Sequence, residues 1–561
     1  MRFVKYVKSA YTIAVLTIAS FLVLAPSLYV VVYVIMHAGQ VVEEAFNHYI
    51  VGSGYWQLIV KALSLSLRLS LSTLALNLAM GVPLAYIISR RRIRGYEFLE
   101  NVATLALVLP TSAFGFSVLI TWSSPLGVAS FFNLGKGIIS QEFVIPVINV
   151  PALLLITHVA LSLPYLVRPL TAALETLGEA YELVSRSLGA STLTTFRRVV
   201  LPLVLPSLVS GSVLALTRSL GETGASVIVA GVNVPASVAI VRLVGVLRFG
   251  LASFLASLMV ASTMALVLPI ELLSKRIGLG REVKDTRVER MLVKIESKLS
   301  HGRFLTSSFK AFIVAVLFLV VLLPVLFVMK STIEYWSRDP YTGRVEGGIL
   351  YQVFGPVGYW PLIIRAALNS LVVAGLSTLI ATYLSILLFT AIRGTRLVPV
   401  IRALFRIPLV VPTSATGLSA LLLYGENGLR LAHPSIWLTI VVHIAFTTPV
   451  VFETLMSASE SIKPETFEEV ARTLGASPYD ALETITLPML KRGIVAGAVL
   501  ALLSSLGETG ATMMVMGSDV TLTVLVVNMA EAMAIPAALF TSTLLLAYAL
   551  VALILLRRVV L

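Results

Sequence analysis

Long apolar runs, each of a length that crosses a bilayer, alternate with short polar connections along almost the whole chain. A spanning helix needs about 20 mostly apolar residues. Six such runs come first, and they lie near residues 11–36, 58–89, 99–122, 147–170, 203–231 and 251–274. Six more follow a polar stretch, and they lie near residues 311–329, 361–392, 398–424, 435–458, 488–516 and 537–556. The pattern predicts an all-α membrane protein with about twelve transmembrane helices.

The composition of the 561 residues supports this prediction, because 58% of them are hydrophobic and only 12% are charged. A soluble domain carries about 25% charged residues to cover its water-facing surface. Large soluble domains are therefore excluded. The chain has no cysteine, which excludes disulfides, thiolate metal sites and cysteine nucleophiles.

Lysine and arginine exceed aspartate and glutamate by 14, and the excess is clustered between apolar runs. Cytoplasmic loops of membrane proteins carry such clusters, so a nucleic-acid partner is the weaker interpretation. The clusters near 90–94 and 186–198 predict cytoplasmic loops, and both termini are expected on the same side. The first apolar run is longer than the 7–15 residues of a signal peptide core. The cation-poor stretches near 37–57, 123–146 and 232–250 are expected outside.

The two sets of runs are copies of one another, because three motifs recur in the same order. The matched pairs are Gly54-Tyr55-Trp56 with Gly358-Tyr359-Trp360, Pro110-Thr111-Ser112-Ala113 with Pro412-Thr413-Ser414-Ala415, and Gly221-Glu222-Thr223-Gly224-Ala225 with Gly507-Glu508-Thr509-Gly510-Ala511. An even number of spans per copy returns the chain to its starting side, which predicts parallel repeats. We expect a first half at 1–274, a charged cytoplasmic linker at 275–310 and a second half at 311–561. An amphipathic surface helix and a plain tether both fit the linker, and we assign it no function.

The connection between the fourth and fifth spans carries a repeated spacing of thirteen residues from a glycine to a proline. In the second half the marked positions are Glu469, Ala471, Gly475, Ile485, Leu487 and Pro488. In the first half they are Leu183, Gly189, Val199, Leu201 and Pro202. Glycine favours the end of a helix and proline favours its first turn. The spacing predicts a compact helical hairpin on the cytoplasmic side of each half.

This doubled motif resembles the coupling loop of permease subunits of binding-protein-dependent ABC importers, where it reads Glu-Ala-Ala, three residues, Gly, nine residues, Ile, one residue and Leu-Pro. The resemblance covers both halves and is closest to permeases in which one polypeptide supplies both. It implies the type I (MetI-like) permease fold, with two copies of an ABC ATPase subunit docked on the two loops and an external solute-binding protein. The first copy departs from the pattern at Leu183, where the family has a glutamate, and Glu182 takes that place only if the helix register shifts.

ATP hydrolysis is expected in a separate subunit, because the chain contains no Gly-x-x-x-x-Gly-Lys-Ser/Thr phosphate loop. The chain itself is expected to be a transport subunit without catalytic residues, metal or cofactor. His158 and His443 are at equivalent positions in the two fourth spans, and a packed, hydrogen-bonding role for them is favoured over metal ligation.

Ionisable residues within spans are costly and usually face the bundle interior or a water-filled cavity. Candidate pathway residues lie in the fifth spans, namely Glu222, Thr223, Glu508, Thr509 and Arg218. Arg218 is spaced to pair with Glu222 at i, i+4, whereas Ser504 stands at its equivalent position. These groups either line the pathway or only hold the bundle together by interhelical hydrogen bonds.

The substrate class follows from two cues that disagree. The Gly-Glu-x-Gly-Ala pentapeptide resembles permeases for molybdate, tungstate or sulfate, while the fusion of two halves resembles ferric-iron and thiamine importers. A small inorganic ion is favoured, and thiamine or another small organic substrate is the alternative. A different class, a secondary transporter driven by an ion gradient through Glu222 and Glu508, also stays open.

Overall fold

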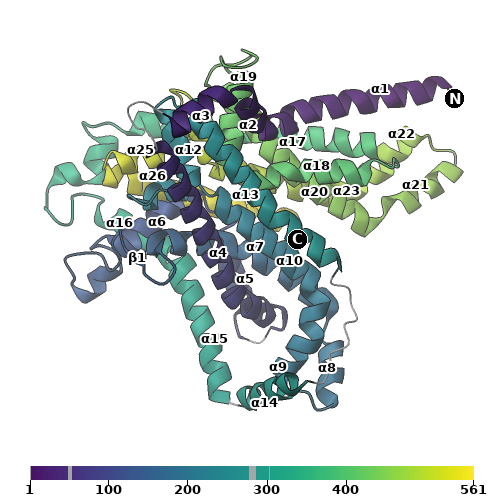
Figure 1. Cartoon of the computed structure of the whole chain (residues 1–561), viewed down its shortest axis with the longest axis horizontal. Coiled ribbons are helices and arrows are strands. Elements are labelled where there is room, and N and C mark those ends of the chain that lie inside the picture. Colours follow the sequence, from purple (N-terminus) through teal and green to yellow (C-terminus); the bar gives the residue numbers. More distant parts are fainter. Residues whose placement is uncertain (1, 48–53, 92, 277–285, 302, 561) are drawn as a thin grey trace.

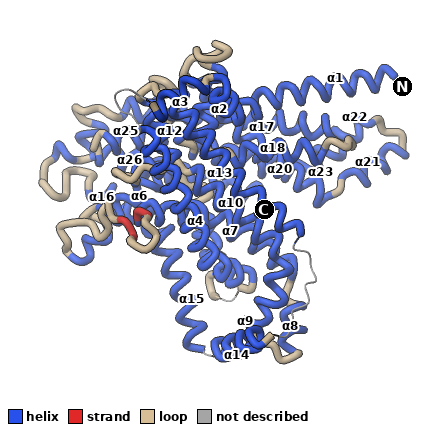
Figure 2. The backbone as a smooth tube through the Cα atoms, viewed as in Figure 1, coloured by secondary structure: helices blue, strands red, loops and turns tan. Residues whose placement is uncertain are grey.

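The computed structural model describes residues 2–47, 54–91, 93–276, 286–301 and 303–560. It is almost entirely helical (Figure 2), and in these residues the one strand pairing is an antiparallel hairpin of β1 (Val144–Ile145) and β2 (Val150–Pro151). Two groups of long helices diverge from a shared centre (Figure 1). The predicted all-α membrane class is confirmed.

The helices before the linker form the first arm, except that α1 lies along the other arm against α17 (Trp360–Ile392) (Figure 1). They are α1 (Arg2–Ala19), the π-helical turn η1 (Ser20–Leu24), α2 (Ala25–Met36), α3 (Ala38–Phe46), α4 (Gly54–Ser89), α5 (Tyr96–Leu105), α6 (Thr111–Ser123), the 3-10 turn η2 (Val128–Phe132), α7 (Ala152–Leu177), α8 (Ala180–Ser187), α9 (Thr192–Thr195), the π-helical turn η3 (Phe196–Val200), α10 (Leu201–Gly221), α11 (Gly224–Val229), α12 (Ala236–Gly245) and α13 (Phe249–Arg276).

The predicted linker contains one helix, α14 (Arg287–His301), and its residues 277–285 and 302 lie outside the described part. The remaining helices are α15 (Arg303–Leu317), the π-helical turn η4 (Phe318–Leu322), α16 (Leu323–Glu334), the 3-10 turn η5 (Val345–Gly347), the π-helical turn η6 (Leu350–Phe354), α17 (Trp360–Ile392), α18 (Val398–Val410), α19 (Thr413–Tyr424), α20 (Ile436–Ile462), α21 (Pro464–Thr473), α22 (Pro478–Ala481), the π-helical turn η7 (Leu482–Thr486), α23 (Leu487–Gly507), α24 (Gly510–Val515), α25 (Leu522–Glu531) and α26 (Ile535–Val560).

Within the described residues, ten helical segments are long and apolar enough to cross a bilayer, and the bent pair α18–α19 makes an eleventh. The third span of each half is two helices rather than one, and the angle between α18 and α19 is 102°. The break falls at Pro110 and Pro412, which adopt extended backbone angles directly before α6 and α19. Proline lacks an N–H and disfavours helical geometry in the residue before it.

The fifth span of each half also ends earlier than predicted. The continuous runs 203–231 and 488–516 are interrupted because α10 ends at Gly221 and α23 at Gly507, and Glu222 and Glu508 are extended. Glycine costs a helix about 1 kcal/mol relative to alanine, so the Gly-Glu-Thr-Gly sequence is a weak helix former inside an otherwise apolar run.

The stretch 232–250, expected as an external loop, instead contains α12, whose Val238 and Ile240 are fully buried. Its counterpart in the second half is α25, which is buried in the same way. A ten-residue apolar helix is too short to span a bilayer, and it escapes a search for spans because surrounding helices, rather than lipid, cover it.

Each half places its first span against the other half. Helices α1 and α2 pack on α17 and α19, while α16 packs on α6. The Tyr11 hydroxyl is 2.8 Å from Thr390 Oγ1, and the Val30 amide donates to Ser419 Oγ at 2.9 Å. The two halves are therefore interlocked by exchange of their first helices, and they are not two bodies that merely touch.

Candidate functional site

The repeated glycine–proline spacing folds into a helical hairpin at the tip of each arm (Figure 1). In the first half the hairpin is α8 and α9, and in the second half it is α21 and α22. The turns are made by Gly189 (φ +89°) and Gly475 (φ +98°), a backbone conformation that L side chains rarely adopt. Ser191 and Ser477 then cap the second helix of each hairpin by accepting the amide hydrogens of Thr194 and Asp480.

One face of each hairpin is exposed and apolar. Leu188 and Leu474, at equivalent positions, are each 84% exposed. Leu183 and Glu469, the position at which the first half departs from the family pattern, are both exposed on the same hairpins. The departure therefore changes a surface group and leaves the fold of the hairpin intact.

The glutamate one position before Leu183 or Glu469 anchors each hairpin, and it is buried in the first half and half-buried in the second. Glu182 is 4% exposed; it accepts from Arg90 Nε at 2.9 Å and from the Tyr86 hydroxyl at 2.7 Å. Arg90 also donates to the carbonyls of Leu174 and Gly178, both at 2.8 Å.

The second half repeats this anchor with different surroundings. Glu468 pairs with Arg393 and accepts a hydrogen bond from the Thr486 hydroxyl. Sequence reasoning missed Glu468 as an anchor and considered Glu182 only with a shift of register. The available signal was a glutamate before the motif position in both copies, together with an arginine after each second span.

The Leu-Pro pairs open the long helices that run from the hairpins to the centre. Pro202 and Pro488 each lie in the first turn of their helix, α10 and α23, and a five-residue π-helical turn precedes each one. Ala471, in α21, and Ile485, in η7, are both half-buried. Motion of a hairpin is thus connected by continuous helix to the centre of the molecule.

The linker helix α14 lies against the first hairpin. Arg197 forms ion pairs with Glu289 at 2.7 Å and with Glu296, and Arg198 pairs with Glu289 at 2.6 Å. Hydrogen bonds from Arg197 and then Arg198 lower the pKa of Glu289. For Glu296, partial burial raises the pKa, but hydrogen bonds from Arg197 and Thr194 outweigh it and the pKa is lowered. These contacts attach the linker to one hairpin.

The two Gly-Glu-Thr-Gly motifs meet at the centre, each against the other half. A Cβ built on Gly224 would lie 2.6 Å from Thr509 Cβ, and one on Gly510 would lie 2.6 Å from Thr223 Cβ. Such distances exclude any side chain at either glycine. We call this crossing of the two motifs the central contact; it closes the space between the halves.

Both glutamates of the motifs are part of the central contact. Glu222 accepts the Ala225 amide hydrogen at 3.0 Å, and Glu508 accepts that of Ala511 at 3.1 Å. Arg218 Nη2 lies 2.6 Å from Glu222 Oε2, as the i, i+4 spacing predicts. Each carboxylate thereby holds the start of a short helix, and one of the two also holds an arginine.

A cavity of about 350 Å³ lies beside the central contact, between the halves. Its lining includes Arg218, Tyr165 and Thr111 from the first half and Ser504 and Glu508 from the second. Of the predicted pathway residues, Arg218 and Glu508 line it, whereas Thr223 and Thr509 are packed in the central contact.

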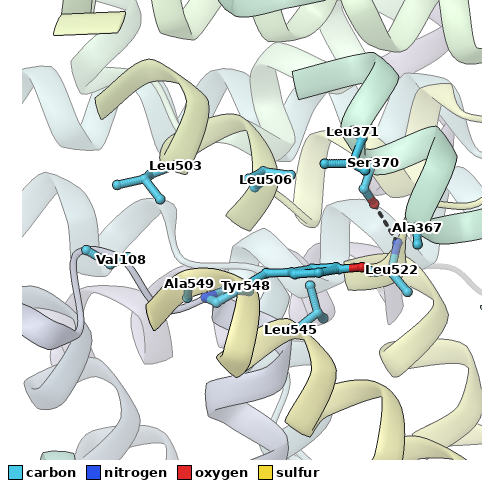
Figure 3. Close-up of a pocket in the computed structure, with 11 residues that line it drawn as sticks. Val108, Ala367, Ser370, Leu371, Leu503, Leu506, Leu522, Leu545, Tyr548 and Ala549 are labelled. Carbon is cyan, nitrogen blue, oxygen red and sulfur yellow. Dashed lines mark hydrogen bonds between the residues drawn. The ribbon is translucent and has the colours of Figure 1, made fainter. Parts of the chain in front are cut away.

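An apolar niche elsewhere between the halves is too small for a solute. Figure 3 shows the Tyr548 ring beside Leu545, with the Leu522 amide donating to Ser370 Oγ at 2.9 Å. The niche has a volume of about 10 Å³, and a cavity needs at least about 10–15 Å³ to hold one water. It is a packing defect between α17, α23 and α26.

The paired histidines act as hydrogen-bonding residues of the core. Both ring nitrogens of His158 lie 2.9 Å from serine hydroxyls, Ser219 and Ser226. His443 contacts Ser505 and Thr512 in the same way, at 2.6 and 2.9 Å. Each ring joins its fourth span to both helices that flank the central contact.

Two helical arms that end in matched hairpins, with a cavity between the halves closed at the centre, define a membrane transport permease. The family model described as "Binding-protein-dependent transport system inner membrane component" matches residues 78–279. These residues include the first hairpin and the first Gly-Glu-Thr-Gly motif.

Individual relatives are permease proteins of transport systems. The chain is 37% identical over 191 residues to the molybdenum transport system permease protein ModB of Mycobacterium tuberculosis, which is 32% of this chain and 66% of the relative. It is 31% identical over 234 residues to the sulfate transport system permease protein CysT of Salmonella typhimurium, covering 40% and 81%. It is also 31% identical over 173 residues to the molybdate/tungstate transport system permease protein WtpB of Pyrococcus abyssi, covering 31% and 61%. The chain belongs to the family of type I ABC importer permeases.

Proposed function

We propose that this chain supplies both transmembrane halves of an ATP-driven importer for a small inorganic oxyanion. The observation that carries the proposal is the pair of matched hairpins, each joined by a continuous helix to the central contact. A secondary transporter has no need for two such hairpins. Each relative aligns with only about a third to two fifths of this chain, as expected if one relative corresponds to one half.

Two ABC ATPase subunits dock on the hairpins in this proposal, one on each. The exposed Leu188 and Leu474 provide equivalent apolar contacts. The other residues that we assign to docking are the positions marked in the repeated glycine–proline motif of the two hairpins. Glu182 and Glu468 support docking indirectly, because they hold α8 and α21 in place. Closure of the ATPase pair then moves the two arms together and opens the central contact outward.

The domain division is part of the proposal: a first half at 1–274, a linker at 275–310 and a second half at 311–561. Both termini and the hairpins face the cytoplasm, as the basic clusters indicate. A solute-binding protein delivers its ligand from outside, and lipid surrounds the arms. The exchange of α1 and α16 between halves keeps the halves paired while the arms move.

The oxyanion class is supported by the relatives, whose names specify molybdenum, sulfate and molybdate/tungstate transport. Thiamine or another small organic substrate is the second candidate, on the resemblance of the fused architecture alone. Selection among solutes belongs mainly to the external binding protein, because the cavity is wider than a tetrahedral oxyanion requires.

The test is purification of the tagged chain from native membranes followed by native mass spectrometry of the complex. We expect one chain with two ATPase subunits, and ATP hydrolysis that stops when Leu188 and Leu474 are both changed to aspartate. Recovery of the chain alone, with solute uptake that follows an ion gradient, would replace the importer by the secondary transporter.

A further inference from the structure

The two halves contribute different polar side chains to the central cavity. At two pairs of equivalent positions the first half supplies Tyr165 and Arg218, while the second half supplies Val450 and Ser504, and all four line the cavity. A pathway that only had to be wide would not need this difference. The asymmetry puts a cation and a phenol on one wall.

Among the described residues that line the cavity, Arg218 is the one cation. Its side chain is 23% exposed, and one Nη atom lies 2.6 Å from Glu222 Oε2. A guanidinium carries five N–H donors in a planar fork that matches the oxygens of an oxyanion. The pairing with Glu222 occupies one Nη atom, and the side chain lines the cavity.

The wall toward the hairpins carries a balanced group of charges. Glu453 lines the cavity and is held by Arg402, at 3.1 Å, and by Arg406, at 2.8 Å. Arg402 also forms an ion pair with Glu460. Two guanidinium groups thus balance two carboxylates, so an anion that enters along this wall does not meet an uncompensated negative charge.

We infer that the cavity is a single oxyanion-binding site on the transport route, with Arg218 as its cation and the hydroxyls of Tyr165 and Ser504 as further donors. This inference rests on the proposed function and assigns the substrate class to particular residues. The site is weak, because Glu222 offsets part of the charge of Arg218 and the carboxyl group of Glu508 lines the same cavity. Weak binding suits transit, since a solute held tightly is not released.

The second half provides a natural control for removing the arginine. Ser504 precedes Glu508 by four residues just as Arg218 precedes Glu222, and Glu508 is half-buried at the cavity whereas Glu222 is buried, so the second half shows this position with a serine and no ion pair. Arg218→Ser therefore makes the first half resemble the second. Ser504→Arg in the same chain returns one arginine to the same cavity from the opposite wall.

The experiment measures uptake of labelled molybdate, tungstate and sulfate, and the ATP hydrolysed, by the whole complex with its binding protein in proteoliposomes. We expect Arg218→Ser to lower oxyanion uptake per ATP on the order of tenfold, the loss of one charge-assisted hydrogen bond. ATP hydrolysis stays near wild type. The double variant Arg218→Ser/Ser504→Arg recovers most of the lost uptake.

Equilibrium dialysis of labelled tungstate against the permease without its binding protein gives a second readout. We expect weak binding to the wild type and the double variant and none to Arg218→Ser. Unchanged uptake in Arg218→Ser, or an equal loss of uptake and ATP hydrolysis that the double variant does not repair, would overturn the site. If the wild-type complex hydrolyses ATP and moves none of the three oxyanions, the proposed substrate class fails as well.

Discussion

The anchoring of the first hairpin by a buried ion pair predicts a large effect from one substitution, Glu182→Ala. The side chains of Arg90 and Glu182 are 2% and 6% exposed. Removal of one partner from a buried pair costs about 3–5 kcal/mol, because the other charge stays buried without compensation. At about 1.4 kcal/mol per factor of ten, release of α8 becomes easier by roughly two to four orders of magnitude.

Amide hydrogen exchange across residues 178–192 measures this release, and the ratio of oxyanion uptake to ATP hydrolysis measures its effect on coupling. We expect fast exchange and a low ratio in Glu182→Ala. Leu183→Ala is the matched control for the exchange measurement, because exposed positions usually change stability by no more than about 0.5 kcal/mol. Glu468→Ala tests the equivalent anchor in the second half.

A double variant separates the ion pair from other roles of the glutamate. Arg90→Leu/Glu182→Leu replaces both charges by apolar groups, which is often neutral for a buried pair. Its exchange is expected to be much slower than that of Glu182→Ala. Unchanged exchange in Glu182→Ala, or a double variant as defective as the single one, would refute the anchor.

Three further predictions concern the turn glycines, the linker helix and the central contact. Gly189→Ala and Gly475→Ala are each expected to destabilise their hairpin by about 1–2 kcal/mol through backbone strain alone, without a clash. The same exchange experiment measures this loss, and a loss in only one hairpin would contradict their equivalence. Glu289→Gln/Glu296→Gln is expected to detach α14 from the first hairpin at pH 7, as seen in spin-label distances between α14 and α8. The folded-state pKa values of these two glutamates are depressed. Their contribution to holding α14 is therefore present above the unfolded-state pKa and is lost as the pH falls through the lowered pKa, so wild-type α14 detaches in acid. Spin-label distances that stay the same would disprove the attachment. Gly510→Val is expected to destabilise the closed central contact by roughly 1–3 kcal/mol through overpacking, lowering the unfolding temperature of the purified chain, whereas an unchanged unfolding temperature would show that the halves do not meet there.

The sequence was sufficient for the features that depend on local chemistry. Apolar runs predict the spans, and the glycine–proline spacing predicts the hairpins, because both act over a few residues. The i, i+4 pair of Arg218 and Glu222 was predictable for the same reason. Proline also explains the broken third spans, although the continuous apolar run concealed the break at Pro412.

The features that the sequence concealed all depend on distant contacts. Arg90 lies 92 positions before its partner Glu182, and the exchange of first spans brings Tyr11 to Thr390, 379 positions away. Helix α12 was taken for an external loop because its burial is produced by other helices. A surface helix was one of the two interpretations of the linker, and Glu289 and Glu296, seven residues apart, share a face of that helix. Only the folded chain pairs them with Arg197.

The central claim is tested most directly by oxyanion uptake into proteoliposomes that hold the complex of this chain, its ATPase and its binding protein. The account predicts uptake that requires both ATP and the binding protein and that is insensitive to dissipation of ion gradients. Uptake that persists without ATP and collapses with the ion gradient would contradict it, and would move the mechanism from the hairpins to Glu222 and Glu508.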